Sequence, residues 1–162
     1  MKENKINIYD VANYFISSNY DPSSESFITP LKLQKLCYYA QAMYLAKYKV
    51  PMFEEKFEAW VHGPVCPVLY EKYKGYGMSP IIPREEFDNK KFSREQKNIL
   101  EYVQNEYGIY DGKFLEYVTH QEKPWQLARK GYSPEERCNV IIDENEMRKF
   151  YSNRWNTKIK EN

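Results

Sequence analysis

The stretch TPLKLQKLCYYAQAMYLAKY, residues 29–48, predicts the longest helix of the chain. Thr29 offers a hydroxyl N-cap, and Pro30 stands at the first helical position, where its missing N–H and fixed φ suit a helix. No glycine or further proline interrupts the following turns. One face of this helix carries Leu33, Leu36, Cys37, Ala40 and Tyr44. We therefore expect this face to pack into the core, with Cys37 behaving as a small buried hydrophobe.

Six further helices are predicted on either side of this segment. Apolar residues recur at helical spacing in residues 7–19, and capping boxes open helices at Ser93 and Asp143. Asp111 is a further N-cap, and proline starts two short helices. Besides residues 30–48, the predicted helices are 7–19, one from Pro64 or Pro67 to Tyr73, 94–107, one from 112 past Val118, 124–130 and 143 to about Arg154.

Residues 58–70, EAWVHGPVCPVLY, predict the only clear change from helical to strand periodicity. Side chains alternate between apolar and polar up to Val61, which is typical of a short strand. Gly63 and Pro64 then predict a turn before the next helix. SPIIP, residues 79–83, is a candidate second strand at a sheet edge, because its prolines cannot donate to a ladder.

These patterns together predict a mainly α (α+β) fold. We expect a single compact domain over residues 1–162, with about seven helices and one small antiparallel sheet of two or three short strands. Residues 1–6 and 156–162 are expected to be frayed.

Composition and charge give no reason to expect a nucleic acid or a membrane as the main partner. Lys and Arg number 24 against 23 Asp and Glu, a formal net charge of +1. The three cysteines form no CxxC pair, which favours reduced thiols and a cytoplasmic protein. Neither a signal peptide nor an apolar run long enough for a membrane span is recognisable. The 16 tyrosines suit a contact surface, because one end of this side chain is apolar and the other polar.

Two short clusters could carry chemistry, and a plainer interpretation is favoured for each. His62 and Cys66 could pair as base and nucleophile, with the helix dipole lowering the thiol pKa. The prolines on both sides of Val65-Cys66, however, favour a turn before a helix. Zinc could be bound by His62, Cys66, His120 and Cys138, but these residues lack the close, paired spacing that structural zinc sites usually show. His120 and Glu122 could form an acid–base pair if they converged with His62 in an open pocket, but capping and packing roles are favoured. We therefore expect no catalytic residues, metal or cofactor.

The lysines of residues 29–49 raise the question of a nucleic-acid stripe. Lys32, Lys35, Lys47 and Lys49 could form one, although such lysines more often line the solvated face of a helix. A nucleic-acid-binding regulator would require Lys32, Lys35, Lys72 and Lys74 on one exposed face.

Three segments, in order along the chain, resemble one known family. Residues 28–46 contain K-L-Q-K-L-x-Y-Y-A-Q, residues 57–73 contain A-W-x-x-G-P-V-x-P-x-x-Y, and residues 117–129 contain T-H-x-E-x-P-W-x-x-A-R. The chain is similar to the Panacea domain family, which includes SocA-like antitoxins and phage-associated GepA-type proteins. One departure is Val118, where the third motif commonly has leucine, a change of similar volume.

The resemblance implies a mostly helical, non-enzymatic bacterial antitoxin that neutralises a cognate toxin by direct contact. A ClpXP-type protease is a further candidate partner, and a phage or mobile-element regulator that binds nucleic acid or a host protein is the alternative. Oligomeric state does not follow from it. The motif residues that it nominates for partner binding are Lys32, Lys35, Tyr39, Gln41, Trp60, Gly63, Pro64, Tyr70, Thr119, His120, Glu122, Pro124 and Trp125.

Overall fold

The computed structural model describes residues 5–23, 28–84 and 87–161. Seven α-helices and one two-stranded sheet lie within these ranges, which confirms the predicted fold class. The elements are α1 (Ile8–Ser18), α2 (Pro30–Tyr48), β1 (Glu58–Trp60), β2 (Gly63–Val65), α3 (Pro67–Tyr73), η1 (Lys74–Tyr76), η2 (Asn89–Lys91), α4 (Arg94–Tyr107), α5 (Gly112–His120), α6 (Lys123–Ala128) and α7 (Glu144–Glu161).

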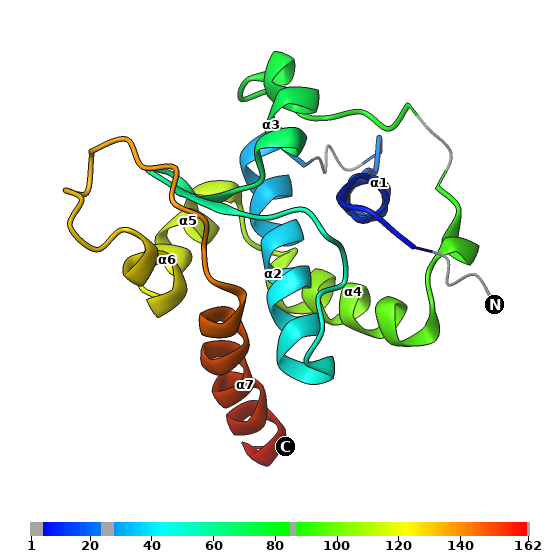
Figure 1. The fold of residues 1–162 in the computed structure, drawn as a ribbon. Helices are drawn as coiled ribbons and strands as arrows, with labels where there is room; N and C mark the ends of the chain where they lie inside the picture. Colours follow the sequence, from blue (N-terminus) through cyan, green and yellow to red (C-terminus); the bar gives the residue numbers. More distant parts are fainter. Residues whose placement is uncertain (1–4, 24–27, 85–86, 162) are drawn as a thin grey trace.

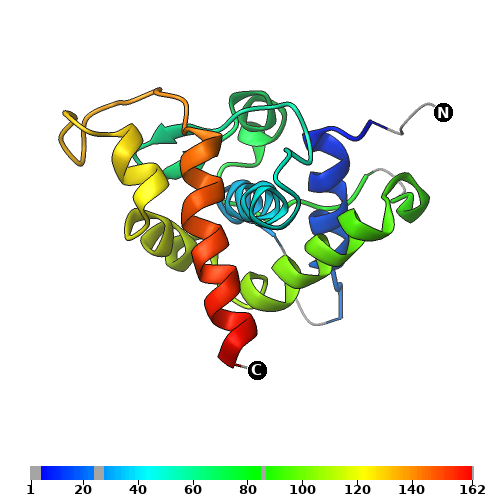
Figure 2. The same cartoon turned by 60° about the horizontal axis from the view of Figure 1, so that its bottom comes forward.

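Helix α2 runs through the centre of the domain. Helices α1, α3, α4, α5 and α7 and strand β2 all pack against it, and Figure 2 shows it nearly end-on with the other helices around it. Buried side chains therefore occur on all its sides, and they include Lys35 and Gln41. The expectation that its lysines line a solvated face is wrong for Lys35, because neighbouring elements cover that side as well.

The predicted N-caps at Thr29, Ser93 and Asp111 are confirmed by single hydrogen bonds. Thr29 Oγ1 accepts from the backbone N–H of Lys32 at 3.3 Å, and Asp111 Oδ1 accepts from that of Phe114 at 2.8 Å. Ser93 and Gln96 form the reciprocal capping box. These contacts satisfy backbone donors that the first turn of a helix leaves free.

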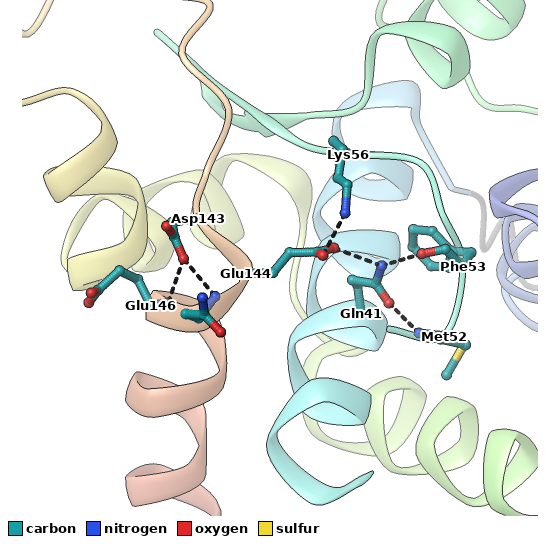
Figure 3. Close-up of polar contacts among 8 residues, drawn as sticks. Gln41, Met52, Phe53, Lys56, Asp143, Glu144 and Glu146 are labelled. Atoms are coloured by element: carbon teal, nitrogen blue, oxygen red, sulfur yellow. Dashed lines mark hydrogen bonds and ion pairs between the residues drawn. The ribbon is translucent and has the colours of Figure 1, made fainter. Parts of the chain in front are cut away.

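Helix α7 begins after Asp143, whose carboxylate accepts from the N–H groups of Asn145 and Glu146 (Figure 3). It extends to Glu161, beyond the end predicted near Arg154. In Figure 1 this helix lies alongside α2 and ends at the lower edge of the domain. Of the ends expected to fray, residues 1–4 and 162 lie outside the described residues.

The turn predicted at Gly63 and Pro64 is in fact part of a strand. Strands β1 and β2 pair antiparallel with Ala59 opposite Pro64, and residues 61–62 make the turn. Gly63 has a φ of +99°, so the glycine serves a left-handed backbone position at the start of β2. The predicted strand at residues 79–83 is reduced to one bridge between Ile81 and Ile28, apart from this sheet.

Candidate functional site

The β1–β2 hairpin is held from within by three long side chains. Arg129 Nη1 donates to the carbonyl of Ala59 at 2.8 Å, and Trp125 Nε1 donates to that of Trp60 at 2.9 Å. Lys35 Nζ donates to the carbonyl of Pro64 at 3.1 Å. These three hydrogen bonds fix both strands of the hairpin to α2 and to the α6 region.

Gly63 is where the hairpin comes closest to the core. A Cβ atom at this position would lie 2.7 Å from Lys35 Cε and 2.9 Å from Thr119 Oγ1. Both neighbours are buried, and Thr119 Oγ1 also donates to the carbonyl of Glu116 at 2.8 Å. Burial lowers the pKa of Lys35 to about 7. The glycine therefore allows the strand to lie directly on a buried lysine.

Glu122 lies at the centre of a buried polar cluster that joins α2, α6 and α7. Its carboxylate accepts from Tyr39 at 2.6 Å and from Tyr151 at 3.0 Å, and Arg154 pairs with its second oxygen. The Tyr39 ring also stacks on Tyr107, with centroids 4.0 Å apart. Burial raises the pKa of Glu122, although the hydrogen bond from Tyr39 and the charge of Arg154 oppose this shift.

The Tyr39→Phe substitution is expected to lower the free energy of unfolding by about 1.5 kcal/mol, because Glu122 loses a donor to a buried carboxylate. The stacked ring itself is retained. Urea denaturation at pH 7 measures the effect, and Tyr117→Phe on the exposed side of α5 is the matched control with little expected change. Equal stability of the two variants would mean that the hydrogen bond from Tyr39 to Glu122 contributes nothing to stability.

Gln41 ties α2 to two other segments (Figure 3). Its Nε2 donates to the carbonyl of Phe53 at 2.7 Å, and its Oε1 accepts from the N–H of Met52 at 2.7 Å. The same Nε2 lies 3.4 Å from a carboxylate oxygen of Glu144 at the start of α7. Lys56 Nζ donates to the other oxygen of Glu144 at 2.6 Å. Gln41 is thus a buried connector between chain segments.

Of the candidate acid–base residues, His62 and His120 both interact with Glu116, whereas Glu122 lies in a separate cluster. His120 stacks on Trp125 with ring centroids 4.1 Å apart, and burial lowers its pKa. His62 pairs through Nδ1 with Glu116 at 3.0 Å, while Glu122 lies in the tyrosine cluster. Pro124 is buried in the first turn of α6. His62 lines the open groove described below, whereas tyrosine hydroxyls surround the carboxylate of Glu122.

Cys66 lacks the lowered thiol pKa of an activated nucleophile. Its backbone N–H donates to Gln34 at 2.9 Å, and burial raises the pKa of its thiol to about 11. The predicted lowering by the helix dipole is therefore wrong, because desolvation outweighs it. Cys37 and Cys138 are buried as well. Among the described residues, no three His, Cys, Asp or Glu side chains are grouped to hold a metal ion.

The four lysines that a nucleic-acid surface required do not form one exposed face. Lys35 is buried, and Lys32 Nζ donates to the carbonyl of Gly108 at 2.6 Å. Lys72 lies over the ring of Tyr9, and Lys74 pairs with Glu71. The arrangement that would favour a nucleic-acid-binding regulator is therefore absent from these residues.

An open apolar groove of about 710 Å³ lies between the start of α2, the hairpin, α3 and residues 109–113. Leu31, Leu33, Val65 and Leu69 contribute to its walls, with Trp60 and Tyr70 in edge-to-face contact at 5.0 Å. At its rim, Met78 is 91% exposed and Ile109 is 76% exposed. Of the nominated motif residues, Lys32, Trp60 and Tyr70 line this groove.

A ridge of exposed aromatic rings continues from the groove along α5. We define this α5 ridge by Tyr110, Phe114 and Tyr117, of which Tyr117 is 62% exposed. The Phe114 centroid lies 4.5 Å from that of Tyr110 and 6.5 Å from that of Tyr117. The sequence contains a signal for this exposure, because Tyr117 falls outside the periodicity that buries Leu115 and Thr119.

The groove and the α5 ridge together have the character of a protein-binding surface, since exposed apolar patches of this kind mark interaction sites. The antitoxin SocA-like, Panacea domain family matches residues 33–126, more than half of the chain. The chain therefore belongs to this family. The match includes the hairpin, most of α2, and the residues that support the hairpin from α5 and α6, apart from Arg129.

One curated relative is similar over a shorter segment. Antitoxin SocA of Caulobacter vibrioides (strain NA1000 / CB15N) is 42% identical over 57 residues. That segment covers 35% of this chain and 30% of the relative, so the likeness spans about a third of each protein. No solved structure matches this chain. No helix in the described ranges has both the length and the apolar character needed to cross a membrane.

Proposed function

We propose that this protein is a bacterial, cytoplasmic antitoxin that neutralises a cognate toxin by direct contact at the groove and the α5 ridge. The proposal rests on membership of an antitoxin family, whose match covers residues 33–126. The physical support is the exposure of large apolar side chains at Met78, Ile109 and Tyr117. A monomer gains from covering such side chains when a partner provides an apolar surface.

The division of the motif residues supports the same proposal. Lys35, Tyr39, Gln41 and Glu122 are buried and connect elements, so they fix the shape of the domain. Contact with a partner is left to residues at the surface, such as Trp60 and Tyr70 beside the groove.

Co-expression with the protein encoded beside this gene tests the proposal. We expect that neighbouring product to arrest bacterial growth when expressed alone and to be harmless when this protein is present. The purified pair should then co-elute. A neighbouring product that is harmless alone, or that stays toxic beside this protein, would contradict the antitoxin role.

The Ile109→Asp substitution is expected to weaken toxin binding at least about tenfold, because a carboxylate would replace an apolar contact at the groove rim. Calorimetric titration of the purified pair measures this. Val50→Asp is the matched control, since Val50 is also more than half exposed but follows the other end of α2. Equal affinities for the two variants would place the toxin on another surface.

The fate of the toxin separates two modes of neutralisation. Simple occlusion leaves the toxin intact in a stable complex, whereas delivery to a ClpXP-type protease shortens its half-life. Immunoblotting of the toxin after synthesis is stopped, in cells with and without ClpXP, distinguishes them.

A further inference from the structure

We infer that the groove takes an apolar segment of the toxin that also bears a carboxylate, which faces Lys32 and Lys113. This inference rests on the proposed function and adds the chemistry of the partner segment. It is carried by the lining of the groove, which combines apolar walls with an excess of positive charge.

The apolar surface that a ligand could cover is longer than the groove itself. Leu31, Leu33, Val65 and Leu69 line it, and the apolar surface continues through Ile109 to the α5 ridge. A small molecule that filled the groove would leave the rim and the ridge exposed. A protein segment covers both and removes more apolar surface from water.

The segment must be bound by its side chains. The N–H of Ala59 already donates to the carbonyl of Val140, and Pro64, which lies opposite, has no N–H. The carbonyls of both residues already accept from Arg129 and Lys35, so these positions offer an added strand no free N–H. Strand addition depends on free backbone groups at a sheet edge. Apolar anchors in the groove, together with a charge contact, are the remaining source of specificity.

The charges of the lining favour an anion. Lys32 and Lys113 line the groove against one carboxylate, Asp111, which accepts from the N–H of Phe114. Lys113 is 70% exposed, and its nearest carboxylate, on Glu116, lies 3.8 Å away and also pairs with His62. Lys32 donates to Gly108, but an ammonium group has three donors, so it can also face a ligand.

A carboxylate suits this site better than a nucleic-acid backbone. With Asp111 in the same lining, the two lysines can balance about one further negative charge, whereas binding to nucleic acid depends on many cations along a surface. The apolar walls would also leave phosphates desolvated and unpaired. A single Asp or Glu side chain within an apolar toxin segment matches both features of the groove.

Charge reversal at Lys113 tests the inference with the purified toxin as probe. We expect Lys113→Glu to weaken toxin binding about fivefold to tenfold, since an attraction becomes a repulsion, and the loss should shrink in high salt. Lys149→Glu is the matched control, because this lysine is 67% exposed on α7 and should leave affinity unchanged.

Toxin variants then identify the carboxylate. Each Asp and Glu of the toxin is reversed to lysine, and one of them, beside large apolar residues, should restore binding to Lys113→Glu. Equal affinity of Lys113→Glu and Lys149→Glu, or weakened binding that no toxin reversal restores, would overturn the inference. So would binding of a single-stranded RNA oligonucleotide that Lys113→Glu abolishes while toxin binding is unchanged.

The same experiments separate this inference from the proposed function. If the unaltered protein neither binds nor neutralises the toxin, the antitoxin role itself fails. If it neutralises the toxin and Lys113→Glu does so equally well, only the assignment of the groove ligand fails.

Discussion

The Gly63→Ala substitution is expected to lower the free energy of unfolding by about 2–6 kcal/mol. A backbone φ of +99° is strained for any residue with a Cβ, which costs on the order of 1–3 kcal/mol. The new methyl group would also lie 2.7 Å from Lys35 Cε and 2.9 Å from Thr119 Oγ1. Lys35 is fully buried with its Nζ on the carbonyl of Pro64, so it cannot swing away freely. Overpacking of this kind adds about 1–3 kcal/mol.

Gly131→Ala is the matched control for this prediction. Gly131 has a similar φ of +91°, but an added Cβ there meets no atom within 4 Å. Its loss of stability should therefore reflect backbone strain alone, and the difference between the two variants measures the contact with Lys35 and Thr119. Denaturant titrations of the three proteins give both values. Equal losses would mean that the close approach of hairpin and lysine is relieved without cost.

Local chemistry made the helices predictable from the sequence. The N-caps at Thr29, Ser93 and Asp111 act within three residues of themselves, so the sequence contains everything that their hydrogen bonds require. Local sequence also explains why a turn was wrongly predicted at Gly63. A glycine followed by proline usually marks a turn, but here the positive φ serves a strand that must lie close to the core.

Burial of the polar motif residues could not be predicted, because it depends on partners far along the chain. Lys35 meets Pro64, 29 residues away, and Tyr39 meets Glu122, 83 residues away. Helical periodicity assigns a lysine to solvent unless such a partner is known. The groove could not be predicted for the same reason, because four separate segments form it and no short sequence pattern describes it.

Most motif residues therefore fix the shape of the domain, whereas much of the proposed binding surface lies outside the motifs. Tyr39, Gln41 and Glu122 connect helices inside the domain, and Gly63 lets the hairpin lie on Lys35. Met78, Ile109, Tyr110 and Phe114 lie outside the three motif segments and are exposed. Substitutions at the buried motif residues should thus act mainly through stability, whereas substitutions at the groove rim should act through affinity with the fold intact.

The buried lysine also predicts how stability depends on pH. Relative to Lys35→Met, the free energy of unfolding of the native sequence should rise by about 2 kcal/mol between pH 7 and pH 9. Burial lowers the pKa of Lys35 to about 7 in the folded protein, whereas an unfolded lysine keeps its proton to well above pH 9. In this window the unfolded chain binds more protons than the folded one, so raising the pH favours folding. Below about pH 7 both states carry the charge, and the dependence on this group ends.

Comparison with Lys35→Met is essential, because other groups titrate in the same window. Burial raises the thiol pKa of Cys37 and Cys66, which makes stability fall as unfolded thiols ionise at higher pH. These thiols are present in both proteins, so their effect cancels in the difference. Lys149→Met, at an exposed lysine, should show no such difference from the native sequence at any pH. A constant gap between the native protein and Lys35→Met from pH 7 to pH 9 would mean that Lys35 remains charged inside the fold, stabilised by the carbonyl of Pro64 and the negative charge of Glu116.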